Sequence, residues 1–486
     1  MELPIRSLAA RGVGFGTSGV RATVDALTDE VCYAYAAAFL KVLARRGPVR
    51  RVAIGHDLRP SSPRITAACA AACRDAGAEV VHCGALPTPA LAHHAMGLGL
   101  PAIVVTGSHI PFDRNGIKFY TPQGEILKED EAAITAATVA LPEGAFAEGR
   151  LVRPAPLPPV DAGALAGYVQ RYAGFVPAGI LRGRRVGLYE HSSVARDVLK
   201  ELLAALGAEV VPLGRTDTFV PVDTEAVSEA DEQKARAWVA EHRLDALVST
   251  DGDADRPLIS DERGEFFRGD LVGLLCARFL GARTVVTPVS SNTAVERCGA
   301  FAQVVRTRIG SPYVIAAMSA PGAQAPVAGY EANGGFLLGS EIVRGGARLA
   351  PLPTRDAALP IVALLVAAAE RGQPLSALRQ GLPARFTASD RIAAFETAKS
   401  QRLLARLSGD PAALRAFFQP LGAPAGVDQT DGLRVTLGSG EIVHLRPSGN
   451  APELRCYAEA DSPERARELL AWGLQTARAS AEQPST

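Results

Sequence analysis

Three aspartates stand at alternate positions in the stretch DGDADR, residues 251–256. In a loop, this spacing lets Asp251, Asp253 and Asp255 turn their carboxylates toward one hard cation, and Mg²⁺ prefers oxygen ligands of this kind. A calcium-binding EF-hand is excluded, because its sixth position needs a glycine and this chain has Arg256 there. The alternative is a solvated acidic turn, which is disfavoured because clustered unpaired carboxylates repel one another. The stretch therefore predicts a magnesium site.

A serine able to carry a phosphoryl group follows an apolar run in VVTGSH, residues 104–109. Ser108 offers a hydroxyl nucleophile, and a nearby Mg²⁺ would orient and neutralise a phosphoryl group on it. The adjacent His109 does not complete a catalytic triad, which also needs an orienting acid. Lys118 follows in the same loop and is expected to return to the same cleft. An ordinary polar turn is the alternative interpretation.

Two further loops have compositions that suit a phosphate group. RPSGNAP, residues 446–452, combines an arginine, a hydroxyl, an amide and backbone N–H groups near a glycine, as an anion nest does. Its alternative is a plain surface turn. GFGTSGVRA, residues 14–22, lacks the spacing of a nucleotide-binding P-loop, so only Arg21 remains as a candidate phosphate contact. The expected phosphate-binding residues of RPSGNAP are Arg446, Ser448, Gly449 and Asn450.

Copies of one pattern organise most of the chain. The pentapeptide GAEVV occurs at residues 77–81 and 207–211, and the looser GAFAQVV occupies residues 299–305. These segments predict a glycine at a helix C-terminus that leads into a strand. A short strand ending in a serine-containing loop lies upstream of each one. Three similar βαβ-based units are therefore expected.

Each unit then reaches a further apolar strand that ends in a polar loop. The first loop carries Ser108, the second carries Asp251, and the third, within AGYEANGG, carries Glu331 and Asn333. In open parallel sheets, ligands bind outside the carboxyl ends of the strands. The three loops are therefore expected to meet at one cleft.

The last hundred residues follow a different pattern. Residues 432–460 alternate with a period of two, and an amphipathic helix is expected over residues 463–477, so this part is an α+β domain with its own antiparallel sheet. Pro-rich and irregular segments divide the chain into four expected domains: 1–156 with the serine loop, 157–267 with the magnesium loop, 268–383 with the loop of Glu331 and Asn333, and 384–486 with the phosphate loop.

The composition excludes several classes of partner. Lys plus Arg and Asp plus Glu both number 51, so no net field favours nucleic acid or a membrane surface. Seven cysteines without a CxxC pair are typical of reduced, packed thiols. The N-terminal residues lack the apolar core of a signal peptide, and the longest apolar run, residues 357–369, is too short to cross a bilayer. A cytoplasmic protein is expected.

The loops, in this order, resemble the α-D-phosphohexomutase family over nearly the whole chain, and within it they are most similar to bacterial phosphomannomutases and phosphoglucomutases. The resemblance implies three similar α/β domains with mixed sheets around a central cleft, and a C-terminal α+β domain that closes over a sugar phosphate. It also implies that Ser108 carries a phosphoryl group in the resting enzyme. The motifs that carry it are FGTSGVR, TGSHIP, NGIK, DGDADR, YEANGG and RPSGNAP.

The chain departs from the family pattern at four places, none of which affects Ser108 or the three aspartates. Ser311, in RIGSP, stands where relatives often have a histidine or aspartate, and Ala22 replaces a common glycine. The sugar loop has Asn333 where many relatives have serine, and ends Gly-Gly instead of Gly-His. Asn450 and Ala451 replace the usual threonine and glutamate. The reaction class is expected to be kept, while the sugar preference is less determined.

The resemblance implies a Mg²⁺-dependent phosphohexomutase that interconverts mannose 6-phosphate and mannose 1-phosphate, and also the glucose phosphates. A hexose 1,6-bisphosphate would be both intermediate and activator. Arg256 would offset phosphoryl charge, Lys118 and His109 would handle the hydroxyl proton, and Glu331 and Asn333 would hold sugar hydroxyls.

Other functions remain possible at this stage. Within the family, the alternatives are a phosphoglucomutase and a phosphoglucosamine mutase. A sugar-phosphate phosphatase could use the same serine and metal, but would not need a clamp for a second phosphate. A non-catalytic binding protein would need no nucleophile beside a metal loop. The expected partners are small-molecule sugar phosphates, and a monomer or homodimer is expected.

Overall fold

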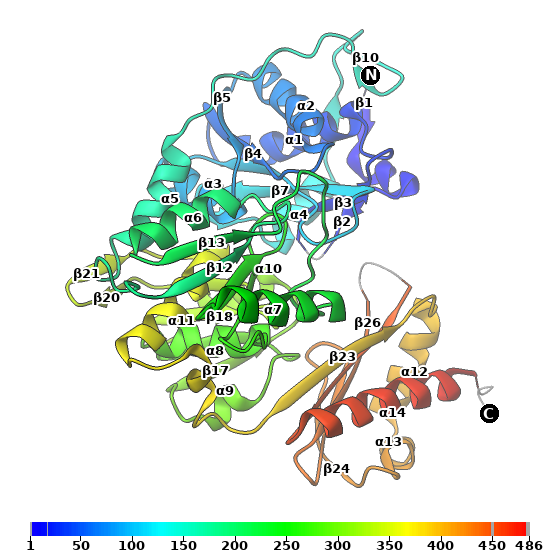
Figure 1. Ribbon diagram of the computed structural model, residues 1–486. Helices are drawn as coiled ribbons and strands as arrows, with labels where there is room; N and C mark the ends of the chain where they lie inside the picture. The colour runs from blue at the N-terminus through cyan, green and yellow to red at the C-terminus, as the bar shows by residue number, and fades with distance from the viewer. Residues whose placement is uncertain (1, 17, 449–451, 483–486) are drawn as a thin grey trace.

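The structure is a computed structural model that describes residues 2–16, 18–448 and 452–482. Four main sheets with their helices follow one another along the chain, and we number the corresponding domains 1 to 4 (Figure 1). The expected domain boundaries all fall between helices and strands of these sheets, and they stay predictions. No helix of the described residues has the length and apolar character needed to cross a membrane.

Domain 1 is built on a mixed sheet with strand order β2-β3-β7-β6-β4-β5, and β8 also pairs with β7. Its strands are β2 (Gly14–Phe15), β3 (Val20–Thr23), β4 (Arg51–His56), β5 (Glu79–Ala85), β6 (Ala102–Val105), β7 (Arg114–Thr121) and β8 (Gly124–Glu125). Its helices are α1 (Asp29–Ala44), α2 (Ser62–Asp75), α3 (Thr88–Gly97) and α4 (Lys128–Thr135). Small peripheral elements are β1 (Glu2–Pro4) with β9 (Thr138–Ala140), β10 (Phe146–Ala147) with β11 (Arg150–Leu151), and η1 (Ile5–Arg11).

Domains 2 and 3 have smaller mixed sheets, with orders β13-β12-β14-β15 and β17-β16-β18-β19-β22. Domain 2 contains α5 (Gly163–Ala173), β12 (Arg185–Tyr189), α6 (Arg196–Ala205), β13 (Glu209–Leu213), α7 (Glu229–His242), β14 (Ala246–Thr250) and β15 (Pro257–Ser260). Domain 3 contains α8 (Gly269–Phe279), β16 (Thr284–Pro288), α9 (Ala294–Arg297), β17 (Gln303–Thr307), α10 (Ser311–Met318), β18 (Val327–Tyr330), β19 (Phe336–Leu338), β20 (Ile342–Arg344), β21 (Ala347–Leu349), β22 (Leu352–Asp356), α11 (Ala358–Glu370) and η2 (Leu375–Arg379).

The same four-strand arrangement recurs in the first three domains. In each, one strand lies between two parallel neighbours, and the third strand along the path pairs with an antiparallel fourth strand. The equivalent paths are β5-β4-β6-β7, β13-β12-β14-β15 and β17-β16-β18-β19. The repeat read from the sequence and the mixed-sheet fold class are therefore confirmed.

Domain 4 has an entirely antiparallel sheet, as the alternating pattern predicts, with order β23-β27-β26-β25-β24. Its elements are β23 (Phe386–Ile392), α12 (Thr397–Gly409), α13 (Pro411–Phe418), β24 (Pro424–Asp428), β25 (Leu433–Leu437), β26 (Ile442–Pro447), β27 (Leu454–Ala460) and α14 (Pro463–Glu482). The last helix extends beyond the expected end at residue 477, because residues 478–482 include good helix formers such as alanine, arginine and glutamate.

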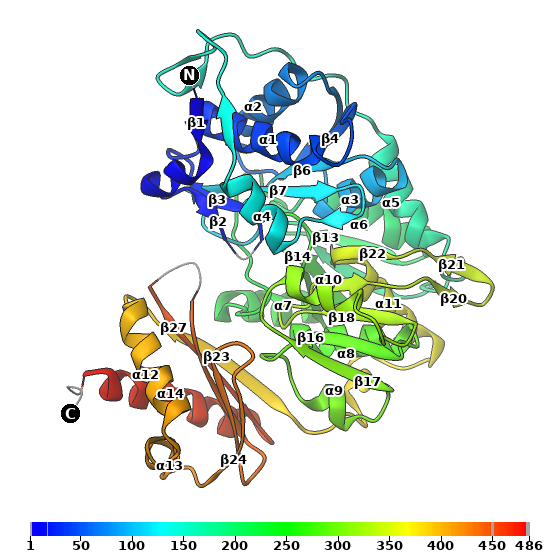
Figure 2. The ribbon, with the colours of Figure 1, turned by 180° about the vertical axis from the view of Figure 1, so that it is seen from behind.

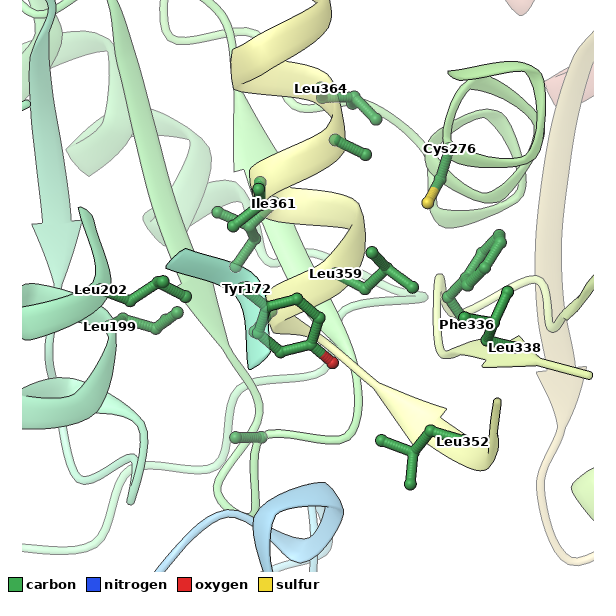
Figure 3. Close-up of a cluster of buried hydrophobic side chains, with 14 of the residues drawn as sticks. Tyr172, Leu199, Leu202, Cys276, Phe336, Leu338, Leu352, Leu359, Ile361 and Leu364 are labelled. Carbon is green, nitrogen blue, oxygen red and sulfur yellow. The ribbon is translucent and has the colours of Figure 1, made fainter. Parts of the chain in front are cut away.

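One hydrophobic core joins the first three domains. Figure 3 shows Tyr172 and Leu199 of domain 2 near α11 of domain 3. Phe336 and Leu352, from strands of domain 3, belong to the same cluster. The same cluster includes one face of the domain 1 sheet, while α1 and α2 cover the opposite face with a separate cluster. Domains 1 to 3 therefore form one packed body.

Domain 4 has its own hydrophobic core, made by its sheet and its three helices. Figures 1 and 2 show it beside the other domains, orange to red, and connected to them through the chain that enters β23. Polar contacts link domain 4 to domain 3. Arg385, buried before β23, pairs with Glu459, which also accepts a hydrogen bond from the backbone N–H of Thr293 at 3.1 Å. Asp431 accepts a hydrogen bond from the N–H of Ile309 at 2.9 Å.

Candidate active site

Three equivalent strand ends bring the polar loops together. β6, β14 and β18 each occupy the third place in the repeated arrangement, and they end immediately before residues 106–109, 251–256 and 331–335. Because each of these strands is buried along its length, its backbone is fixed and the loop after it begins from a rigid support. The convergence expected from the strand ends is visible in the contacts between the loops.

Ser108 is buried and directed at the aspartate loop. Its hydroxyl donates a hydrogen bond to Oδ2 of Asp251 at 2.6 Å, although the two residues belong to different domains. Its backbone has a φ of +52°, a left-handed conformation that a non-glycine residue rarely adopts. The N–H of Ser108 donates to Oγ1 of Thr106 at 2.8 Å, and the N–H of Gly107 donates to Asp57 at 3.0 Å. Such strain is typical of functional sites, where surrounding contacts stabilise it.

The aspartate loop is tightly folded and buried. One ligand atom each of Asp251, Asp253 and Asp255 lie within 4.8 Å of one another, and within the described residues these form the single such group that could hold a metal ion. Oδ1 of Asp251 accepts the N–H groups of Asp255 and Arg256 at 3.1 and 3.2 Å, which closes the turn. Ala254 has a φ of +60°, so this loop is strained as well.

The three carboxylates fit a divalent cation. Oδ1 of Asp253 and Oδ1 of Asp255 are buried, and neither accepts a hydrogen bond within the described part of the chain. A buried, unpaired acceptor is costly, and coordination of a hard cation would satisfy it. Burial, together with repulsion from Asp255 and Asp253, raises the pKa of Asp251 well above its usual range, as expected for crowded buried carboxylates.

Lys118 supplies positive charge from the neighbouring strand β7. Its buried ammonium lies 2.7 Å from Oδ2 of Asp253 and 2.5 Å from Oδ2 of Asp255. Burial is the largest single influence on Asp253 and would raise its pKa, but the charge and hydrogen bond of Lys118, the hydrogen bond of Thr88 and the charge of Arg355 together hold that pKa below its usual range. The sequence predicts a place for Lys118 in the loop after Ser108, but Lys118 lies on β7, and the pairing of β7 with β6 brings its ammonium to the aspartate loop that contacts Ser108.

His109 and Arg256 flank the serine. Nδ1 of His109 lies 3.2 Å from the hydroxyl oxygen of Ser108, and its Nε2 lies 3.5 Å from a guanidinium nitrogen of Arg256. The charge of Arg256, with burial as the second cause, lowers the pKa of His109 to about 3, so the ring is neutral near pH 7. Arg256 also lies 3.6 Å from Asp255, which places its charge beside the site of any phosphoryl group on Ser108.

Arg21 lies at the domain 1 side of the same site. It is partly buried on β3, and its guanidinium donates to the carbonyl oxygen of Thr106, two residues before Ser108. Burial lowers the pKa of Arg21 to about 10, with Asp253 acting in the opposite direction. Arg21 therefore remains charged at neutral pH and close to the serine loop.

The loop that carries Glu331 and Asn333 is linked to the aspartates through a residue that the sequence did not reveal. Arg355, at the end of β22, lies 2.9 Å from Asp255 and 3.2 Å from Glu331, and all three side chains are buried. Asn333 accepts the N–H of Gly335 at 2.9 Å through its side chain, so it shapes the turn that presents Glu331. No motif surrounds Arg355, and its partners lie far away in the sequence, so no sequence signal identified it.

The position of Ser311, where relatives often have a histidine or aspartate, is linked to a buried carboxylate. The Ser311 hydroxyl, at the start of α10, lies 3.1 and 3.2 Å from the two oxygens of Glu125 in domain 1. Ser18, in the loop before Arg21, donates to the same carboxylate. Glu125 is a second residue missed from the sequence, and it joins domains 1 and 3 beside the site.

The phosphate-loop residues lie in domain 4, and of these Arg446 and Ser448 are in the described part of the chain. Arg446, on β26, forms an ion pair with Asp431 at 2.8 Å. Ser448 is buried and its N–H donates to the carbonyl of Glu453 at 2.9 Å. Gly449 and Asn450 lie outside the described residues. Asp431 is also the residue that contacts Ile309, so Arg446 is one side chain removed from domain 3.

The fold of the chain matches that of a solved protein structure. A phosphoglucomutase/phosphomannomutase family protein from Burkholderia thailandensis superposes with a TM-score of 0.73 at 21% identity, covering 97% of this chain and 98% of that one. At this identity the likeness shows the fold alone.

Sequence comparison identifies the family. The phosphoglucomutase/phosphomannomutase α/β/α domains I, II and III match residues 12–143, 167–264 and 268–386, and the C-terminal domain of that family matches residues 402–471. A phosphomannomutase from Sinorhizobium fredii is 48% identical over 468 residues, covering 95% of this chain and 98% of that protein. A phosphoglucosamine mutase from Parafrankia sp. is 30% identical over 498 residues, covering 94% and 96%. The chain belongs to the phosphoglucomutase/phosphomannomutase family, which confirms the resemblance read from the loops.

Proposed function

We propose that this protein is a Mg²⁺-dependent phosphohexomutase that interconverts mannose 6-phosphate and mannose 1-phosphate, and also acts on the glucose phosphates. The observation that carries the proposal is the hydrogen bond from Ser108 to Asp251 inside a buried group of three aspartates. A serine at this place can hold a phosphoryl group next to the cation that the aspartates fit. The 48% identity to a phosphomannomutase supports mannose over glucosamine, for which the similarity is 30%.

In the proposed reaction, phosphorylated Ser108 gives its phosphoryl group to the free hydroxyl of a sugar phosphate. The bond from phosphorus to the serine oxygen breaks as the bond to the sugar oxygen forms, and a hexose 1,6-bisphosphate results. After reorientation, the bisphosphate returns its other phosphoryl group to Ser108. His109 lies 3.2 Å from the hydroxyl oxygen of Ser108, and Lys118 pairs with Asp253 in the same site. We propose that these two residues exchange the hydroxyl proton.

Each remaining group has a distinct task in this proposal. Asp251, Asp253 and Asp255 hold Mg²⁺, which when bound offsets negative charge on the transferring phosphoryl group. Arg256 and Arg21 stabilise that charge from the side. The sugar hydroxyls are held by Glu331 and Asn333, and the phosphate that does not react is held by Arg446, Ser448, Gly449 and Asn450.

The separate hydrophobic core of domain 4 suits this division of tasks. The serine and the aspartates belong to the packed body of domains 1 to 3, whereas Arg446 belongs to a domain with its own core. A sugar bisphosphate must present two phosphates in turn to Ser108, so a phosphate clamp on a separate domain can follow the ligand as it turns. We also propose a cytoplasmic location, a monomer or homodimer, and hexose 1,6-bisphosphate as activator.

One incubation tests the function. The protein is mixed with mannose 1-phosphate, Mg²⁺ and a trace of glucose 1,6-bisphosphate, and mannose 6-phosphate and free phosphate are measured over time. The proposal expects mannose 6-phosphate with little free phosphate. Release of free phosphate as the main product would indicate a phosphatase instead. The same assay with glucose 1-phosphate and glucosamine 1-phosphate ranks the sugars by kcat/KM, and turnover of glucosamine 1-phosphate alone would contradict the mannose assignment.

A further inference from the structure

Arg59 lies beneath the serine loop and has no exposed side-chain surface. Its guanidinium donates hydrogen bonds to the carbonyl oxygens of Pro111 at 2.7 Å, Arg114 at 2.9 Å and Ser108 at 3.0 Å, and also to that of Ile110. These carbonyls all belong to residues 108–114, so one planar cation ties the whole loop together. A guanidinium suits this task because its donors spread in a fixed plane.

Asp57 orients Arg59 from the other side. Its Oδ2 lies 3.3 Å from Nε of Arg59 and also accepts the N–H of Gly107 at 3.0 Å. Its Oδ1 accepts the backbone N–H of Arg59 at 3.0 Å and the hydroxyl of Ser62, at the start of α2, at 2.5 Å. The ion pair is therefore anchored to a helix and reaches the residue immediately before Ser108.

The guanidinium leaves no room for a side chain at residue 107. A Cβ atom placed on Gly107 would lie 2.3 Å from the guanidinium carbon of Arg59, well inside van der Waals contact. The backbone of the loop thus lies directly against Arg59. Together with the hydrogen bond from Ser108 N–H to Thr106, this contact determines the conformation in which Ser108 has its positive φ.

Domain 2 covers the outer face of the same guanidinium. The centre of the Phe219 ring lies 4.0 Å from the guanidinium carbon of Arg59, which is a cation–π contact with a buried charge. Phe219 also approaches the aspartate loop, because a Cβ on Gly252 would lie 3.3 Å from its ring and 2.9 Å from the carbonyl oxygen of Ser108. Arg59 therefore lies where the serine loop of domain 1 meets the aspartate loop of domain 2.

We propose that Arg59 is a positioning residue for phosphoryl transfer: it holds Ser108 in its strained conformation and so keeps the hydroxyl oxygen directed at Asp251. The inference rests on the proposed function, because it assigns Arg59 to the transfer carried out at Ser108. Removal of a fixed orientation of this kind lowers the rate of the chemical step, since a displacement of about 1 Å can cost about 100-fold. Binding of the sugar phosphate, which involves other loops, is expected to change little.

The test uses Arg59→Lys in the full-length protein. Lysine keeps the charge but cannot reach four carbonyls in one plane. The matched control is Arg64→Lys, on α2 of the same domain, where the guanidinium pairs with Asp29 and donates to the carbonyl of Leu27 at 2.9 Å, away from the serine loop. Thermal unfolding, kcat and KM for mannose 1-phosphate are measured for both. In addition, each protein is phosphorylated with glucose 1,6-bisphosphate, and the phosphoserine is followed as it passes to sugar phosphate or to water.

We expect Arg59→Lys to lower kcat by about 10- to 100-fold with KM within about threefold of wild type. The fraction of phosphoserine lost to water, relative to transfer, should rise by a similar factor, because a loosened loop no longer aligns Ser108 with the sugar. Arg64→Lys should lower the unfolding temperature and leave kcat and this partition unchanged. A purely structural role for Arg59 would change stability in the way Arg64→Lys does, without changing the partition.

The outcomes separate this inference from the proposed function. If wild type is never phosphorylated on Ser108, the proposed function fails. If wild type is phosphorylated and Arg59→Lys keeps a normal kcat and partition, the inference is overturned while the function stands. Where Arg59→Lys does not fold, Phe219→Leu decides, since it removes the aromatic face and keeps an apolar cover. We expect about a fivefold lower kcat and a shifted partition for Phe219→Leu, and wild-type values would overturn the inference.

Discussion

Replacement of Arg355 by methionine is the perturbation for which the structure allows the clearest estimate. Arg355 is buried at the junction of domains 2 and 3, 2.9 Å from Asp255 and 3.2 Å from Glu331. At an effective dielectric of about 20, these separations correspond to attractions of about 6 and about 5 kcal/mol. Much of this is offset by the cost of removing three charges from water, so the net contribution is smaller than the sum.

Loss of Arg355 affects its two carboxylate partners, Asp255 and Glu331, unequally, because only one of them keeps a positive charge beside it. Asp255 keeps Lys118 at 2.5 Å, whereas among the described residues Glu331 pairs with Arg355 alone. Removing one partner of a buried ion pair destabilises a protein by about 3–5 kcal/mol, because a charge remains buried without a partner. We therefore expect Arg355→Met to lower the free energy of unfolding by about 3–5 kcal/mol, and the double variant Glu331→Gln/Arg355→Met to recover most of that loss.

The two tryptophans of the chain provide a domain-specific assay. Trp238 lies on α7 in domain 2 and Trp472 lies on α14 in domain 4. In a Trp472→Phe background, urea unfolding followed by fluorescence therefore reports on the body formed by domains 1 to 3. The control is Arg348→Met, which removes an exposed ion pair with Glu341 in domain 3 and should cost no more than about 1 kcal/mol. An effect of Arg355→Met as small as that of the control, or no recovery in the double variant, would refute the reasoning.

Four other predictions address the serine, the metal, the phosphate clamp and pH. Ser108→Ala should abolish phosphorylation and turnover while the protein unfolds at a normal temperature, and phosphopeptide mapping of wild type should find Ser108; phosphate on another residue that supports turnover would contradict this. Asp253→Asn should weaken Mg²⁺ binding in a direct titration, because one of three carboxylate charges is lost; unchanged affinity would exclude Asp253 as a ligand. Arg446→Ala should raise KM for mannose 1-phosphate and leave phosphorylation of Ser108 possible, and unchanged KM would show that Arg446 only pairs with Asp431. Burial lowers the pKa of His444 to about 4 in the folded state; the unfolded chain therefore binds more protons below about pH 6.5, and stability is lost as pH falls from there to about 4, by at most about 3 kcal/mol. Unfolding of domain 4, followed by Trp472, should show this loss, and His444→Gln should reduce it.

Much of the site could be predicted because its residues follow strand ends in short local motifs. Asp251 and Glu331 come directly after a buried strand and Ser108 follows one within three residues, and the repeated GAEVV segments indicated that those strands are equivalent. Loops at equivalent strand ends must meet if the domains pack around one centre. The positions of these residues relative to the strands were therefore enough to predict that they share one site.

The residues that escaped prediction act through distant partners. Arg355 lies in LPTRDA, and Arg59 in DLRPSS, without any unusual composition nearby. Their roles depend on burial and on carboxylates or carbonyls supplied by other loops, often in another domain. The pairing of Ser311 with Glu125 is of the same kind, since it joins α10 to β8 across two domains. A single sequence contains no information on which of 51 acidic residues a buried arginine or serine will contact.

The balance of charge at the site suggests how metal and phosphoryl group depend on each other. Three carboxylates, those of Asp251, Asp253 and Asp255, are contacted by three cations, Lys118, Arg256 and Arg355. A divalent cation alone, or a phosphoserine with about two negative charges alone, would unbalance this buried group, whereas both together would not. We therefore expect Mg²⁺ to bind more tightly when Ser108 is phosphorylated, and by linkage Mg²⁺ should favour the phosphorylated form equally. Calorimetric titration of Mg²⁺ into phosphorylated and dephosphorylated protein measures this coupling, and equal dissociation constants would show that the cation and the phosphoryl group do not share one site.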